Sequence, residues 1–190
     1  MRKVLFFMFT SLNGYYDRGK PHLDWDNIDW HNFDEEMSAL SNAQLNSVDV
    51  LLFGRKTYEG MASFWPTPEA LADSPETAEQ MNSLPKIVFS RTLDKAEWNN
   101  TRLVRDPVEE IAKLKEQPGV DVIVMGSSEL AVSLGERGLI DEYRIMVNPI
   151  LLAEGTPLFQ GLGSDVRLEL LQAKAYKNGN VLLSYEPVRS

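Results

Sequence analysis

Short runs that are apolar throughout alternate along the chain with longer stretches of mixed polar and apolar residues. Short apolar runs are typical of strands buried on both faces of a sheet, and the mixed stretches between them are typical of helices. This pattern predicts strands at residues 2–10, 48–53, 86–90, 101–104, 121–125 and 142–147. It predicts helices at residues 33–46, 56–62, 75–82, 107–117 and 128–137. Helices between such strands imply a mainly parallel sheet that is covered on both faces.

The end of the chain has a different pattern. Two strand-like runs, 167–177 and 180–185, are joined by Lys177-Asn178-Gly179-Asn180. Asn-Gly between such runs is a strong signal for a β-hairpin. We therefore predict an α/β fold with a mixed, mainly parallel sheet flanked by helices and ending in an antiparallel C-terminal hairpin. Residues 13–32 are predicted to form a long aromatic-rich loop that folds over a pocket or the edge of the core.

Composition narrows the class of protein. With 190 residues and no internal repeat, the chain fits a single domain over residues 1–190. Cysteine is absent, which excludes disulfides and thiolate chemistry and fits the cytoplasm. No apolar segment approaches the roughly 20 residues needed to cross a bilayer. The net charge of −9 argues against a nucleic-acid or anionic membrane partner, although a local group of cations can still bind an anionic ligand.

The exit of the strand at 48–53 carries the first candidate chemistry. The strand ends at Gly54, and Arg55, Lys56 and Thr57 follow at the start of a predicted helix. Free N–H groups at a helix start suit phosphate, and the two cations would add charge-assisted hydrogen bonds. The alternative is an ordinary strand-to-helix turn with two solvated cations.

Two further strand exits have a similar character. Ser90 and Arg91 follow the strand at 86–90, and Gly126-Ser127-Ser128 follows the strand at 121–125. Because ligands of open α/β sheets collect at the carboxyl ends of the strands, the three exits can converge on one nucleotide with several phosphates. Arg91 and Ser90 would grip a terminal or 2′-phosphate, and the glycine turn would admit a pyrophosphate. The alternative for that turn is a simple helix N-cap, and neither the dinucleotide fingerprint nor the P-loop motif is present.

These motifs occur in the same order as in a known family. Ser11-Leu12-Asn13-Gly14, Gly54-Arg55-Lys56-Thr57-Tyr58-Glu59, Phe89-Ser90-Arg91, Val124-Met125-Gly126-Ser127 and Asp141-Glu142 resemble the dihydrofolate reductase superfamily. Pro149-Ile150-Leu151-Leu152 through Gly155-Thr156-Pro157-Leu158-Phe159 resembles the reductase (C-terminal) domain of the bifunctional riboflavin-biosynthesis deaminase/reductase. The deaminase zinc signature is missing, so only the reductase half is represented.

The resemblance implies a dihydrofolate reductase-like fold and NADPH as the hydride donor to a small pyrimidine or pterin-like acceptor, as in 5-amino-6-(5-phosphoribosylamino)uracil reductase. It implies that Arg55, Lys56 and Thr57 meet the cofactor phosphates, that Ser90 and Arg91 favour the 2′-phosphate, and that Gly126, Ser127 and Ser128 lie against the pyrophosphate. The loop at 11–16 would border the nicotinamide. The family also implies a homodimer. Dihydrofolate reductase proper and a noncatalytic nucleotide-binding module remain the alternatives.

The residues predicted to bind the substrate are acidic and precede the strand that ends at Gly54. By resemblance, Asp34 or Glu35, with Glu36 beside them, would bind the acceptor ring and assist its protonation. The alternative is that these residues only stabilise the helix dipole, which is worth about 0.3–1 kcal/mol each. Asp17 and Asp24 are further candidates. His22 and His31 lack the spacing and partners of a metal site, so no metal is predicted.

Overall fold

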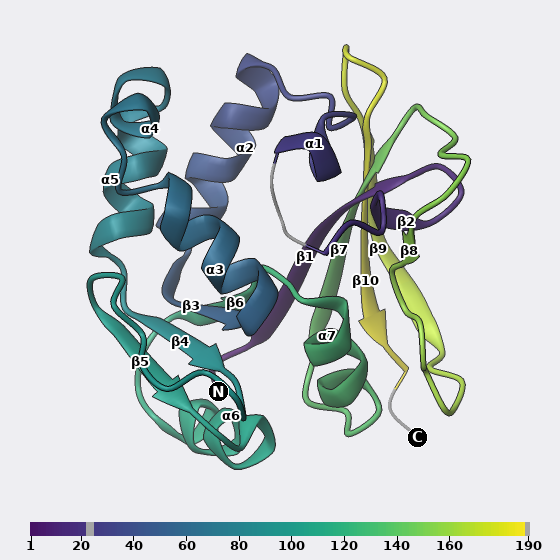
Figure 1. Ribbon diagram of the computed structural model, residues 1–190. Coiled ribbons are helices and arrows are strands. Elements are labelled where there is room, and N and C mark those ends of the chain that lie inside the picture. Colours follow the sequence, from purple (N-terminus) through teal and green to yellow (C-terminus); the bar gives the residue numbers. More distant parts are fainter. Residues whose placement is uncertain (22–24, 189–190) are drawn as a thin grey trace.

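The computed structural model describes residues 1–21 and 25–188 and has an eight-stranded sheet as its centre (Figure 1). The strands lie in the order β5-β4-β3-β6-β1-β7-β10-β9. Strands from β5 to β7 in this order run parallel, whereas β10 is antiparallel to both of its neighbours. The bounds are β1 (Val4–Ser11), β3 (Val48–Gly54), β4 (Lys86–Phe89), β5 (Thr101–Val104), β6 (Asp121–Val124), β7 (Glu142–Asn148), β9 (Leu168–Ala175) and β10 (Val181–Pro187). The predicted fold class is confirmed.

Alternate residues of the central strands face two separate apolar layers. In β1, Val4 and Phe6 pack into one layer, and Leu5 and Phe7 pack into the other. Side chains of α6 (Pro107–Glu116) and α7 (Ser128–Gly135) complete the first layer. Side chains of α2 (Glu35–Asn46), α3 (Arg55–Phe64) and α5 (Pro75–Ser83) complete the second. Burial on both faces explains why these strands are apolar throughout.

Several elements lie where the sequence predicts none. The predicted loop at 13–32 contains β2 (Tyr15–Asp17) and α1 (Trp25–Ile28), and β2 pairs with β8 (Thr156–Pro157) in a separate two-stranded sheet. The short helix α4 (Pro68–Asp73) also escaped prediction. Other predicted boundaries differ from the observed ones by a few residues. In the described ranges, the longest apolar helices fall short of what a membrane crossing requires.

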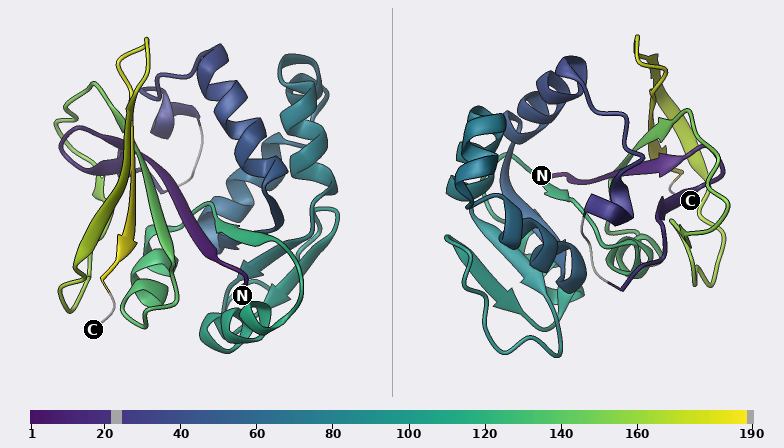
Figure 2. Two further views of the ribbon diagram at one scale, coloured as in Figure 1. Left: turned by 180° about the vertical axis from the view of Figure 1, so that it is seen from behind. Right: turned by 45° about the horizontal axis from the view of Figure 1, so that its top comes forward.

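The topology gathers the strand exits that matter for function. Since β4, β3, β6 and β1 are parallel neighbours, their carboxyl ends lie along the same edge of the sheet. The β9–β10 hairpin, drawn in yellow, stands at the opposite end of the sheet from the blue and teal helices α2 to α5 (Figure 2). The candidate site therefore lies in the parallel part of the fold.

Candidate functional site

The turn after β3 and the turn after β6 lie directly against each other. The Gly54 N–H donates to the Gly126 carbonyl oxygen at 2.9 Å. A Cβ added at Gly54 would run into the Ser127 hydroxyl, and one added at Gly126 would lie 2.7 Å from the Thr57 Oγ1. Gly126 also has a φ of +110°, and its peptide bond to Ser127 is cis. Only glycine fits at these two positions without displacing the facing turn.

Two helices begin at this junction with free backbone donors. Within the described part of the chain, the N-caps Gly54 of α3 and Ser127 of α7 make no side-chain capping hydrogen bond. By contrast, Asp34 caps α2 and Asp106 caps α6 through their carboxylates. Uncapped N–H groups and the positive ends of two helix dipoles therefore point to one edge of the sheet, which suits an anion such as a pyrophosphate.

The predicted residues of the α3 turn take different positions. Arg55 is half exposed, and its guanidinium lies 3.8 Å from the Glu59 carboxylate in a weak surface pair that a ligand can replace. Thr57 is buried against Gly126. The Lys56 Nζ is committed elsewhere, because it lies 3.1 Å from an Asp17 carboxylate oxygen and 3.0 Å from the Lys20 carbonyl oxygen. The structure thus places Gly54, Arg55 and Thr57 at the junction and turns Lys56 toward the segment after β2.

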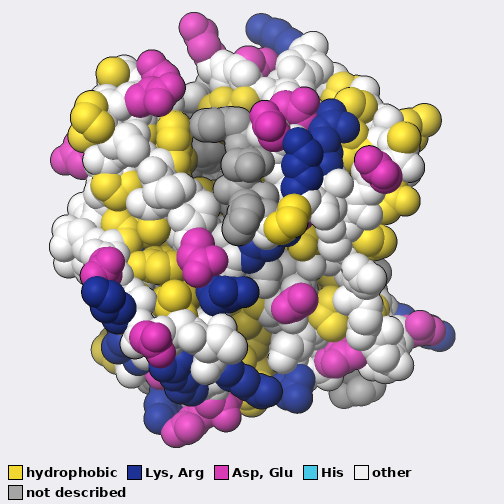
Figure 3. Space-filling view, viewed as in Figure 1, with side chains coloured by type: hydrophobic (Ala, Val, Ile, Leu, Met, Phe, Trp, Pro, Cys, Tyr) yellow, Lys and Arg dark blue, Asp and Glu magenta, His cyan; other side chains and the backbone are white. Residues whose placement is uncertain are grey.

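A second basic feature lies at the exits of β4 and β5. The Ser90 Oγ accepts hydrogen bonds from the backbone N–H groups of Thr92 and Leu93, at 3.2 and 3.0 Å, and Arg91 is exposed. Arg105 donates to the carbonyl oxygens of Ser90 and Leu93, both at 2.7 Å. Dark-blue Lys and Arg side chains gather in the lower left of Figure 3, where Figure 1 places β4 and β5.

Arg105 was missed in the sequence prediction. It follows β5, and β5 pairs with β4 so that Val104 lies beside Phe89. Because the two strands run in parallel and end together, the residues just after them meet. The sequence does show a cation, Arg105, just after a short predicted strand. That position indicates a place near Ser90 only once the order of the strands in the sheet is known.

The acidic candidates have structural partners. Asp34 accepts a hydrogen bond from the Met37 N–H at 3.0 Å, as an N-cap does. Glu35 is exposed, and Glu36 accepts from the Lys177 N–H at 3.1 Å. Asp17 is completely buried and holds Lys56. The catalytic roles of Asp34 and Glu35 stay predictions, and Asp24 and His22 lie outside the described residues.

An aromatic cluster lies just before α2. The His31 imidazole stacks on Phe9 with ring centroids 4.7 Å apart, and the Trp30 ring meets it edge-on at 4.4 Å. Burial lowers the pKa of His31 to about 4, and its Nε2 is buried without a hydrogen-bond partner. His31 is therefore neutral at pH 7, and Phe33, half exposed, continues the cluster toward solvent.

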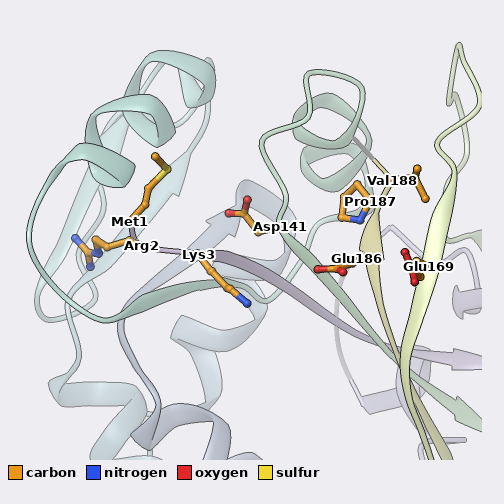
Figure 4. Close-up of a pocket in the computed structure, with 8 residues that line it drawn as sticks. All are labelled: Met1, Arg2, Lys3, Asp141, Glu169, Glu186, Pro187 and Val188. Atoms are coloured by element: carbon orange, nitrogen blue, oxygen red, sulfur yellow. The ribbon is translucent and has the colours of Figure 1, made fainter. Parts of the chain in front are cut away.

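The surface hollow in Figure 4 lies at the other edge of the sheet. Residues at the start of β1, before β7 and at the end of β10 line it, including Lys3, Asp141 and Glu186. Asp141 accepts from the Lys115 ammonium at 2.6 Å and from the Val4 N–H at 2.8 Å, so it serves the structure of this edge. Among the residues that the structure describes, no predicted site residue lines this hollow.

Comparison with known proteins agrees with the fold and the motif order. The model of the RibD C-terminal domain matches residues 2–182. Protein YyaP of Bacillus subtilis (strain 168), described as uncharacterized, is 29% identical over 185 residues, which are 97% of this chain and 94% of YyaP.

Comparison with solved structures shows similarity to the same fold. A Shewanella sp. PV-4 protein named for riboflavin biosynthesis is 25% identical with a TM-score of 0.71, covering 98% of this chain and 99% of that one. Dihydrofolate reductase from Enterococcus faecalis, solved with NADP(H), is 17% identical with a TM-score of 0.62, covering 98% and 97%. The dihydrofolate reductase-like fold is thereby confirmed.

Proposed function

Since the chain belongs to the RibD C-terminal domain family, we propose that it is an oxidoreductase that transfers hydride from NADPH to a small pyrimidine or pterin-like acceptor. The observation that carries this proposal is the junction of two helix starts without side-chain caps, at Gly54 and Ser127, with Arg91 and Arg105 on the neighbouring strand exits. An anionic ligand with phosphates at both places is what this arrangement fits.

The junction fits a dinucleotide pyrophosphate. Gly54 and Gly126 let the two turns approach each other closely, and the first N–H groups of α3 and α7, brought together there, would act as donors. Thr57, Ser127 and Ser128 add hydroxyl groups, and Arg55 adds a cation. When bound, NADPH supplies the hydride, and the protein contributes binding and orientation.

The exits of β4 and β5 supply the preference for a 2′-phosphate. One guanidinium nitrogen of Arg105 donates to the Ser90 and Leu93 carbonyl oxygens, and these bonds fix the guanidinium group near the exposed residue Arg91. The remaining N–H groups of both guanidinium groups suit a phosphate dianion, for which Arg offers several donors. A bare ribose hydroxyl offers these cations no charge, so NADH should bind less well.

The acceptor ring would lie beside the start of α2. Phe33 is half exposed there, next to the Phe9–His31 stack, and a flat heteroaromatic ring can stack on such a surface. Asp34 or Glu35 would then assist protonation of the acceptor. The absence of cysteine supports a reducing compartment such as the cytoplasm for this activity.

Titration with NADPH and NADH, followed by tryptophan fluorescence, tests the cofactor. We expect a preference for NADPH that falls by about tenfold or more in Arg91→Ala and in Arg105→Ala, because one charge-assisted hydrogen bond contributes about 1.5–3 kcal/mol. NADH affinity should stay the same in both variants. Arg137→Ala, which removes an exposed arginine that donates to Ser133 one turn earlier, is the matched control.

Four outcomes discriminate between the proposals. Equal losses for NADPH and NADH would exclude the 2′-phosphate role of Arg91 and Arg105. Oxidation of NADPH with dihydrofolate, but not with aminopyrimidine acceptors, would favour dihydrofolate reductase proper. Tight NADPH binding without oxidation by any such acceptor would leave a noncatalytic binding module, and binding of neither nucleotide would overturn the proposal.

A further inference from the structure

The segment just before α2, residues 30–33, crosses the carboxyl ends of β1 and β7. The Asn32 N–H donates to the Asn148 Oδ1 at 2.8 Å, and Asn148 is the last residue of β7. Phe9, near the end of β1, stacks on His31. Because β1 and β7 run parallel to β6 and β3, this segment lies at the same edge of the sheet as the two helix starts. Ligands of such sheets bind at this edge.

Aromatic rings hold the His31 imidazole in one orientation. The Phe9 ring lies nearly parallel to it, with 20° between the ring planes, and the Trp30 ring meets it at 87°. The Trp30 Nε1–H donates to the Asn27 carbonyl oxygen at 3.2 Å, which fixes the indole in turn. Asn27 itself is completely buried. An imidazole packed on two sides in this way keeps its polar edge pointing in one direction.

One polar atom of this fixed ring is unsatisfied. Among the residues that the structure describes, the His31 Nε2 is buried and has no hydrogen-bond partner, whereas Nδ1 is not such an atom. Nearly all buried polar atoms of folded proteins have a partner, and an exception calls for a reason such as a group that binds there. A neutral imidazole has one N–H and one lone pair, and Nδ1 can keep the proton. Nε2 then offers a lone pair without a donor.

The surroundings of His31 keep this lone pair unprotonated. Burial lowers the pKa of His31 to about 4. The charged group that acts on the imidazole is Asp29, which is exposed and pairs with the Arg18 guanidinium at 2.7 Å. The imidazole therefore stays neutral at pH 7 and can accept a hydrogen bond but cannot supply a proton. Its role differs from that proposed for Asp34 or Glu35.

From these observations we infer that His31 determines which acceptor binds, because its Nε2 accepts a hydrogen bond from a ring N–H of that acceptor. This role of His31 rests on the proposed function, whose acceptor site it describes. Phe33 is 51% exposed and lies 6.3 Å from Phe9, so a flat ring can reach the cluster by displacing this exposed side chain. A pyrimidinedione fits, since it combines ring N–H groups with a flat face that stacks on aromatic side chains.

Calorimetric titration with two compounds, each with and without NADPH, tests the inference. The compound 5,6-diaminouracil carries ring N–H groups, and its 1,3-dimethyl derivative carries none. We expect the unchanged chain to bind 5,6-diaminouracil about tenfold more tightly, which is the effect of one buried hydrogen bond. His31→Phe keeps an aromatic ring on Phe9 but removes the acceptor atom, so most of this preference should disappear.

Two further variants complete the design. Tyr143→Phe also removes one polar atom from a buried aromatic side chain, but in the first apolar layer, and it should keep the tenfold preference. His31→Gln retains a polar acceptor at the position and should recover part of the preference. Circular dichroism checks that each variant folds. NADPH affinity should be the same in all of them, because the helix starts and the arginines are unchanged.

Three results would overturn the inference. The unchanged chain could bind neither compound, or it could bind both equally. His31→Phe could also weaken both compounds by the same factor, which would mean that the imidazole only packs. Failure of the proposed function gives a different result: a chain that distinguishes the two compounds through His31 but binds no NADPH contradicts only hydride transfer. A chain that prefers NADPH but does not distinguish the compounds contradicts only the role of His31.

Discussion

At the residue scale, His31 makes the free energy of unfolding depend on pH. Its pKa is lowered to about 4 by burial, so the folded state holds the imidazole neutral, whereas the unfolded state takes up a proton near pH 6.5. The stabilisation is complete above pH 6.5 and is lost as the pH falls toward 4. We expect the free energy of unfolding to drop by about 2 kcal/mol between pH 7 and pH 5 through this group alone.

The variant His31→Phe isolates this effect, because it keeps an aromatic ring stacked on Phe9 and removes the proton acceptor. Urea unfolding at both pH values should show a smaller drop for His31→Phe than for the unchanged chain. Other titrating groups, including the nearby Asp29, are common to both proteins and cancel in the difference. Equal pH dependence would show that His31 is not held neutral by the fold.

Gly54 is the residue on which the junction of the two helix starts depends. Gly54→Ala would force its methyl group into the Ser127 side chain, and overpacking of this kind costs about 1–3 kcal/mol. We expect a matching loss of thermal stability and weaker NADPH binding. The double variant Gly54→Ala/Ser127→Gly, which removes the clashing side chain, should recover part of the stability. A fully tolerated Gly54→Ala would contradict the close approach of the turns.

Among the elements, β2 is tied to α3 by a buried ion pair. Asp17 is completely buried, and its carboxylate accepts from the Lys56 ammonium and from the Gly19 N–H at 2.7 Å. Lys56→Met would leave this carboxylate without its charged partner, and removing one member of such a pair costs about 3–5 kcal/mol when both are buried. Since Lys56 is one-third exposed, we expect about 1–3 kcal/mol.

Urea unfolding and hydrogen exchange check the expected loss. Exchange at residues 15–20 should rise in Lys56→Met, and the double variant Asp17→Asn/Lys56→Met should be more stable than the single one, because no buried charge is left unpaired. Lys113→Met, at an exposed helix pair, is the control. If Lys56→Met weakens NADPH binding without changing exchange at 15–20, Lys56 contacts the phosphates directly, as the family resemblance predicts.

The sequence predicted elements well wherever local pattern decides them. β3, β4 and β6 have apolar residues on both faces, and Asn178-Gly179 marks the hairpin, so the sheet could be predicted. The pairing of β2 with β8 joins residues far apart in the chain and leaves no periodic signal. For the same reason the sequence did not show that Lys56 pairs with Asp17, which comes from another element, or that Arg105 contacts the Ser90 carbonyl group.

At the scale of the whole molecule, the net charge and the local charge should act in opposite ways on the anionic cofactor. A chain with a net charge of −9 repels it, whereas the local cations near Arg91 and Arg105 attract it. Raising the salt shortens the Debye length from about 10 Å at 0.1 M to about 3 Å at 1 M. Screening should weaken NADPH binding severalfold, because the proposed contact between the arginines and the phosphate contributes more than the distant acidic charges. Fluorescence titration at both salt concentrations measures this trend. Salt-independent NADPH binding would mean that the arginines do not contact phosphate.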